Sequence, residues 1–162
     1  MIHLLLVASL AIAEPADLVK ENKLPPEAEQ ALRAPGKVTL YSLEPDIPPV
    51  PRDKALHQVF HNAKLLGQTE LDGKQSAMAV AEIKSAISEW KGQIFMCFSP
   101  RHALRVTAKG HTYDFLLCYA CQALEIYRDD QPLASLGAAG SPKVLNQLLR
   151  AAKVPLALRA GE

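Results

Sequence analysis

Three cysteines and one histidine in the middle of the chain have the residue types for thiol or metal chemistry. They are Cys97, His102, Cys118 and Cys121. Cys118 and Cys121 are three residues apart, and a tight turn between them would bring their Cα atoms close enough for a disulfide. All four side chains together form a Cys₃His set, which suits tetrahedral zinc, and soft thiolates also suit Cu(I).

Four interpretations of this group stay open. A structural disulfide between Cys118 and Cys121 leaves Cys97 as a buried free thiol, because three cysteines cannot all pair. A zinc or copper site uses all four residues. A thiol–disulfide oxidoreductase needs a CxxC pair whose thiol pKa is lowered by nearby cations, such as Arg101. A nucleophile pair of His102 with Cys97 or Cys118 has suitable residue types, but the pattern indicates no third group that orients the histidine.

Charged residues beside the cysteines indicate a second site. Arg101, Arg105 and Asp114 lie in the same central stretch. Arginines could line a pocket for a small anion or a carboxylate. The alternative is an ordinary surface ion pair between Arg105 and Asp114, which would contribute little stability.

The stretch that holds both groups is typical of an antiparallel sheet. Four runs of β-forming residues follow one another and predict the strands Ile94–Phe98, Ala103–Ala108, Thr112–Tyr119 and Ala123–Arg128. Lys109-Gly110 fits a two-residue hairpin loop, which pairs Arg105 with Asp114 and Leu104 with Phe115. A second two-residue loop at Ala120-Cys121 pairs Phe115 with Ile126.

This register assigns side chains to two faces, because successive residues of a strand point to opposite sides. The predicted core face carries Leu104, Val106, Tyr113, Phe115, Leu117, Leu124 and Ile126. The predicted opposite face carries Arg105, Asp114, Leu116, Cys118, Glu125 and Tyr127. In a meander the first and third strands end at the same edge, so Cys97, Ser99, Arg101 and His102 should meet Cys118 and Cys121 there. Cys97 would lie about 9–10 Å from Cys118 if one strand separates them.

The rest of the chain predicts helices that cover the sheet. Residues 14–56 are Pro-rich and contain a short helix after Pro25-Pro26 and a strand at Val38–Leu43. Asp72 should cap a long helix over Gly73–Lys91, with Trp90 on its apolar face. Ser141 should cap a C-terminal helix.

A histidine pair offers a minor alternative for metal binding. His57 and His61 are four residues apart, a spacing that would place both on one face of a helix. The surrounding residues favour a strand near Lys64–Thr69 instead.

Residues 1–13 are typical of a secretory signal peptide. Leu4–Ala13 is an apolar run and Ala11-Ile12-Ala13 matches an A-x-A cleavage site. The run is too short to span a membrane, which takes about 20 apolar residues. We therefore expect a periplasmic or secreted protein with no stable membrane insertion after cleavage. The 18 basic and 17 acidic side chains nearly balance, which argues against nucleic-acid binding.

Two motifs resemble an uncharacterised family of small exported bacterial proteins. The family pattern is C-F-x-P-R-H-x-x-R, then a strand with an aspartate, then C-[FY]-x-C. The matching residues are Cys97, Phe98, Pro100, Arg101, His102, Arg105, Asp114, Cys118, Tyr119 and Cys121. The resemblance implies export and points to these residues as the site, and it implies no activity.

The sequence predicts an α+β protein. After the signal peptide (1–13) and the Pro-rich segment (14–56), residues 57–162 should form the main α+β domain. An antiparallel, meander-like sheet of five or six strands should pack against one long helix and a C-terminal helix. The function that fits best is a non-enzymatic binding or interaction module, for example inhibitor- or immunity-like, whose partner is an unknown protein or a small anionic ligand, with no cofactor. The alternative is a metal-binding or thiol-redox protein that uses Cys97, His102, Cys118 and Cys121, and a hydrolase is a distant third.

Overall fold

The protein is an α+β fold with one antiparallel sheet of seven strands. The computed structural model describes residues 22–45, 59–93, 95 and 97–158. Within these residues the strands are β1 (Val38–Glu44), β2 (Val59–Phe60), β3 (Ala63–Glu70), β4 (His102–Ala108), β5 (His111–Cys118), β6 (Ala123–Arg128) and β7 (Gln131–Gly137). Their order across the sheet is β2-β3-β1-β4-β5-β6-β7.

The predicted hairpins of the central stretch are confirmed. Arg105 pairs with Asp114 across β4 and β5, and Phe115 pairs with Ile126 across β5 and β6. Lys109 and Gly110 both have positive φ (51° and 81°). This backbone conformation is typical of a two-residue hairpin loop. Strands β4 to β6 therefore form the last three strands of the predicted meander, and β7 continues it beyond β6.

The predicted number of strands is too low, and the sheet is a meander only in part. β1 lies between β3 and β4 and pairs antiparallel with both. A candidate edge strand at Leu133–Leu136 is present as the longer β7, and the unpredicted strand is the two-residue β2, which continues the sheet beyond β3. A sequence pattern finds neighbours joined by short loops, but it cannot find a distant strand that inserts between two others.

The strand predicted at Ile94–Phe98 is wrong for its described residues. Phe95, Cys97 and Phe98 are not in a strand, while Ile94 and Met96 lie outside the described residues. Both edges of β4 are already occupied, by β1 and β5, so no place beside β4 remains for this segment. It lies instead against the turn after β5, where the Phe95 N–H donates to the Cys121 carbonyl oxygen at 3.2 Å.

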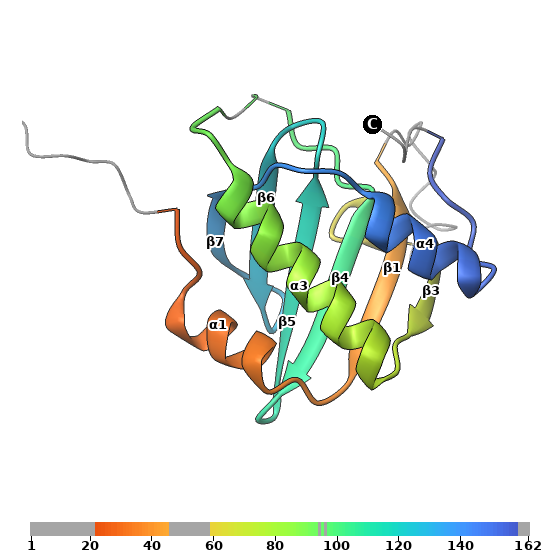
Figure 1. The fold of residues 1–162 in the computed structure, drawn as a ribbon, viewed down its shortest axis with the longest axis horizontal. Coiled ribbons are helices and arrows are strands. Elements are labelled where there is room, and N and C mark those ends of the chain that lie inside the picture. The colour runs from red at the N-terminus through yellow and green to blue at the C-terminus, as the bar shows by residue number, and fades with distance from the viewer. Residues whose placement is uncertain (1–21, 46–58, 94, 96, 159–162) are drawn as a thin grey trace, which may run out of the picture.

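Within the described part of the chain, three helices cover one face of the sheet (Figure 1). They are α1 (Pro26–Arg33), α3 (Gly73–Glu89) and α4 (Lys143–Ala151). Asp72 caps α3 as predicted, because its carboxylate accepts from the Gln75 N–H while the Gln75 side chain accepts from the Asp72 N–H. Ser141 does not cap α4, whose N-cap residue is Pro142.

Trp90 lies beyond the end of α3 and not on its apolar face. The backbone at Trp90 is extended, so the helix ends one residue earlier. Its indole packs over Gly137 so closely that an added Cβ there would lie 2.2 Å from the ring. Gly137 thus allows the residue after α3 to pack on the last strand.

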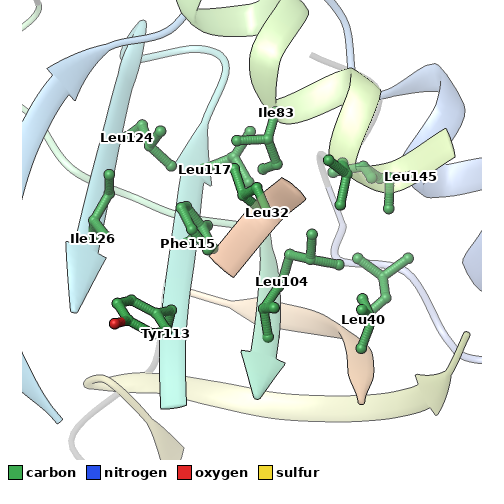
Figure 2. Packing of buried hydrophobic residues seen from close by; sticks show 14 of the residues in the cluster. Leu32, Leu40, Ile83, Leu104, Tyr113, Phe115, Leu117, Leu124, Ile126 and Leu145 are labelled. Carbon is green, nitrogen blue, oxygen red and sulfur yellow. The ribbon is translucent and has the colours of Figure 1, made fainter. Parts of the chain in front are cut away.

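The main core lies between the sheet and the helices, as Figure 2 shows. The predicted core face is confirmed, since Phe115, Leu104 and Leu124 are completely buried. They pack against residues from the helices, including Ile83 of α3 and Leu145 of α4. Burying each such side chain contributes about 1.5–3 kcal/mol, so this layer dominates the stability.

The sheet curls strongly towards the face that the helices leave open. His61, in the turn between β2 and β3, contacts Asp114 of β5 and Tyr127 of β6, although β1 and β4 separate β3 from β5. A second apolar cluster lies inside this curl and includes Tyr41, Phe60 and Leu116. Among the described helices, none is long and apolar enough to cross a membrane.

Candidate functional site

Cys118 and Cys121 form a disulfide across the turn between β5 and β6. Their Cα atoms lie 5.1 Å apart, and both residues are buried, with exposed fractions of 2% and 1%. The turn can be this tight because Gln122 adopts a positive φ of 52° before β6 begins. The predicted pairing of these two cysteines agrees with this geometry.

Cys97 is an exposed free thiol that touches this disulfide. Its S–H donates to Cys121 Sγ with the two sulfur atoms 3.3 Å apart. The expectation of a buried thiol separated from the CxxC pair by a strand is therefore wrong. The segment that carries Cys97 does not join the sheet, so it can cross the end of β5 and reach the turn directly. We call Cys97, Cys118 and Cys121 the sulfur cluster.

Two backbone N–H groups point at the sulfur atoms of the disulfide. The Ser99 N–H donates to Cys121 Sγ at 3.4 Å, and the Cys121 N–H donates to Cys118 Sγ at 3.2 Å. Phe98 packs over the pair from the open face of the sheet. Hydrogen bonds from N–H groups favour a charged sulfur over a neutral one.

His102 does not join the sulfur cluster. It alternates with Leu104 and Val106 along β4, and its ring is buried on the helix side, 1% exposed. Its Nε2–H donates to the Asn146 side-chain oxygen of α4 at 2.7 Å. Burial lowers the pKa of His102 to about 4, although the hydrogen bond to Asn146 opposes this shift. The same alternation was visible in the sequence and could have placed this residue in the core.

The predicted zinc or copper site is therefore not assembled. Cys118 and Cys121 are bonded to each other and offer no thiolates in this state. The fourth predicted ligand, His102, faces the opposite side of the sheet. What the structure brings together is three sulfur atoms, two in a disulfide and one in a free thiol.

The turn of the disulfide is anchored to the helix layer. The Tyr119 hydroxyl donates to Glu82 of α3 at 2.9 Å, and the Tyr119 ring lies edge-on to His102. Burial, followed by the nearby charge of Glu82, raises the pKa of Tyr119 far above its usual value, so the hydroxyl stays protonated and keeps donating. This tie holds one side of the CxxC turn in place while the other side faces Cys97.

Comparison with protein-family models, with curated proteins and with solved structures finds no match to this chain. The resemblance to small exported bacterial proteins stays a prediction. Function must accordingly be argued from the geometry of the site.

A second polar group lies on the same face of the sheet and near the middle of β5. We call His61, Arg105, Asp114 and Asp130 the charge cluster. Arg105 holds Asp114 in a bidentate pair, with Nε and Nη2 each 2.6 Å from a carboxylate oxygen. Asp114 is only 1% exposed, so a charge in this position requires such partners.

His61 completes the coordination of Asp114 from the curled-over hairpin. Its Nε2 lies 2.6 Å from Asp114 Oδ2, and its ring stacks near Tyr127 with centroids 4.1 Å apart. His61 and Asn62 both have positive φ, 44° and 67°, as a two-residue hairpin loop demands. Sequence reasoning considered His61 only as a partner of His57, which lies outside the described residues. The Asn62 turn signal was the available indication of this hairpin.

The pKa of Asp114 reflects this environment. Burial raises it, but the hydrogen bonds from Arg105 and His61 outweigh burial and leave the pKa below its usual value. The carboxylate is therefore ionised at neutral pH.

The predicted anion pocket is not favoured by this arrangement. Arg105 already faces two carboxylates, since Asp130 lies 3.5 Å from its Nη2. Arg101 is oriented elsewhere and donates to the Ser99 carbonyl oxygen at 3.4 Å, beside the cysteines. His61, Asp114 and Asp130 do have ligand atoms within 4.8 Å of one another. A divalent ion there would, however, face the guanidinium of Arg105 at the same carboxylate, which opposes binding.

A shallow pocket of about 340 Å³ lies between the two clusters. His61 and Tyr127 contribute to its lining from the charge cluster, and Phe98 and Pro100 from the segment that carries Cys97. Glu125 adds a carboxylate that accepts a hydrogen bond from the Tyr127 hydroxyl at 2.7 Å. Phe98, in the lining of this pocket, is the residue that follows Cys97 in the chain.

Proposed function

We propose that this protein is a thiol–disulfide exchange protein, in which the Cys118–Cys121 disulfide oxidises thiols of other molecules. One observation carries the proposal, namely the contact of 3.3 Å between the exposed Cys97 thiol and Cys121 Sγ. Disulfides are exchanged by a thiolate that attacks one of their sulfur atoms. A thiol held against a buried disulfide is the minimal arrangement for that reaction.

The surroundings of the sulfur atoms support the same chemistry. N–H groups of Ser99 and Cys121 donate to the two disulfide sulfurs, and a leaving thiolate needs such donors. The expected export of the chain, which rests on residues 1–13, would place it in an oxidising compartment where disulfides form and persist.

The net reaction transfers two electrons. Two external thiols are joined as a disulfide, and the Cys118–Cys121 bond is reduced to two thiols. The protein then carries three thiols, and an oxidant of its compartment, such as a more oxidising disulfide, would restore the original pair. This places the protein in the redox class, the alternative that the sequence suggested, without the metal.

Equilibration in glutathione redox buffers tests this function. The full-length protein is incubated with mixtures of reduced and oxidised glutathione, quenched by alkylation and weighed by mass spectrometry. We expect a graded change from one to three alkylated cysteines, with a reduction potential above about −300 mV, the upper end typical of structural disulfides. A disulfide that survives excess reduced glutathione while the protein stays folded would contradict the proposal.

A non-enzymatic binding module is the second candidate, supported by the pocket between Phe98 and Tyr127. Its partner would be a protein or a small ligand that contacts this face of the sheet. The two candidates differ in their dependence on the disulfide. Cys121→Ser should leave partner binding intact, whereas it should abolish thiol exchange.

A further inference from the structure

We infer that the three cysteines act as a relay in which Cys121 exchanges its disulfide partner between buried Cys118 and exposed Cys97. The inference rests on the proposed exchange function and names the order in which the sulfur atoms react. The inference is based on the different exposure of the three cysteines. Cys97 is exposed, whereas Cys118 and Cys121 are only 2% and 1% exposed. An external thiol therefore has no direct route to the disulfide.

The internal step begins at Cys97. Its thiol loses a proton to solvent, and the thiolate attacks Cys121 Sγ, the atom it already contacts at 3.3 Å. The Cys97–Cys121 bond forms as the Cys118–Cys121 bond breaks, and the electron pair leaves on Cys118 Sγ. That sulfur accepts the Cys121 N–H, 3.2 Å away, and then takes up a proton. One disulfide is exchanged for another, with no net oxidation or reduction.

The external steps occur at the surface. A thiolate of the substrate attacks Cys97 Sγ, forms a mixed disulfide, and releases Cys121 as a thiolate that accepts the Ser99 N–H. A second substrate thiolate attacks the substrate sulfur of this mixed disulfide. The substrate leaves as a disulfide, Cys97 is free again, and Cys118 and Cys121 remain reduced. The substrate class is thus any thiol that can reach an exposed cysteine, such as glutathione or a cysteine of an unfolded polypeptide.

The structure gives each sulfur one role. Cys97 is the sulfur that meets the substrate, Cys121 is the switching sulfur, and Cys118 stores the bond in the interior. A thiol that does not contact a disulfide could not take part in such a sequence of exchanges. The relay also limits reactivity, because the stored disulfide stays closed to solvent until Cys97 attacks it.

Cys118→Ser is the decisive variant, because it leaves Cys121 only one possible partner. The variant is purified under air oxidation, digested without reductant and mapped by mass spectrometry. We expect a disulfide between Cys97 and Cys121. The matched control is Cys121→Ser, which removes the switching sulfur and should leave Cys97 and Cys118 as free thiols. Free Cys97 and Cys121 in Cys118→Ser, under conditions that oxidise the wild-type protein, would overturn the relay.

Cys97→Ser tests the route taken by an external thiol. This variant keeps the Cys118–Cys121 disulfide, and we expect glutathione to reduce it at least about tenfold more slowly than in the wild type, a change equivalent to about 1.4 kcal/mol in the activation free energy. Far-UV circular dichroism establishes that the variant is folded. An unchanged rate would overturn the relay and leave the exchange function standing. Conversely, a wild-type protein that never reacts with glutathione would remove the proposed function, even if Cys118→Ser forms the Cys97–Cys121 bond.

Discussion

The charge cluster and the sulfur cluster lie on the same face of the sheet and share strand β5. Asp114 contributes to the first and Cys118 to the second, four residues further along the strand. In the charge cluster, the buried carboxylate is held by Arg105 and His61 from two other elements. In the sulfur cluster, a free thiol lies 3.3 Å from a disulfide sulfur that we propose it attacks.

One strand thus carries both a polar site whose hydrogen bonds are satisfied and a disulfide that we propose to be reactive. The polar contacts at Asp114 are satisfied, so any change there should cost stability. The contact of Cys97 with the disulfide is not covalent, so a change of this residue should alter the reactivity of the cluster more than the stability of the fold.

Asp114→Asn should have the largest effect on stability. It removes the negative charge that holds Arg105 and His61, and breaking a buried ion pair from one side costs about 3–5 kcal/mol. Urea unfolding followed by the fluorescence of Trp90 measures this loss. The control is Asp130→Asn, whose carboxylate is 78% exposed and should matter by no more than about 0.5 kcal/mol. Equal losses for the two variants would refute the structural role of Asp114.

Acid should weaken the fold in two separate pH windows. Burial lowers the pKa of His102 to about 4 in the folded protein, whereas the pKa is about 6.5 in the unfolded chain. Between these two pH values the unfolded chain binds a proton that the folded protein does not. About 3 kcal/mol of stability is therefore lost as the pH falls from about 6.5 to 4. The pKa of Asp114 is also lowered, so its contribution is present above about pH 4 and is lost below that.

Two variants separate these pH windows. Unfolding free energies measured from pH 8 to pH 3 should show the upper window disappear in His102→Gln. Cys118→Ser should not change the pH dependence of these unfolding free energies, because neither His102 nor Asp114 belongs to the sulfur cluster. A His102→Gln variant that retains the loss between pH 6.5 and 4 would show that another group is responsible.

Cys121→Ser should reduce the stability less than Asp114→Asn or the protonation of His102 does. The Cys118–Cys121 bond closes a very short loop. A cross-link of that length lowers the conformational entropy of the unfolded chain and thereby stabilises the fold by about 2 kcal/mol. Urea unfolding with and without a reductant measures it. The reduced wild type should match the variant, and reductant should not change the variant further. A loss as large as that of Asp114→Asn would mean that the sulfur cluster also holds the fold together.

Much of the meander was predictable from the sequence because short loops determine which residues face each other. Lys109-Gly110 sets the pairing of Arg105 with Asp114, and that pairing assigns the faces of Phe115 and Cys118. The core residues followed from the same alternation. The disulfide was predictable because its two cysteines are only three residues apart.

Only the tertiary structure decided what reaches those residues from far away. His61 and Asp114 are 53 residues apart and meet because the sheet curls, while Cys97 reaches Cys121 because its segment is excluded from the sheet by β1. Local propensities do not encode such contacts. They depend on how seven strands share their edges and on how far the sheet twists, and both are properties of the packed whole. The sequence by itself thus determined the strand that carries both clusters, and the packing decided which partners complete them.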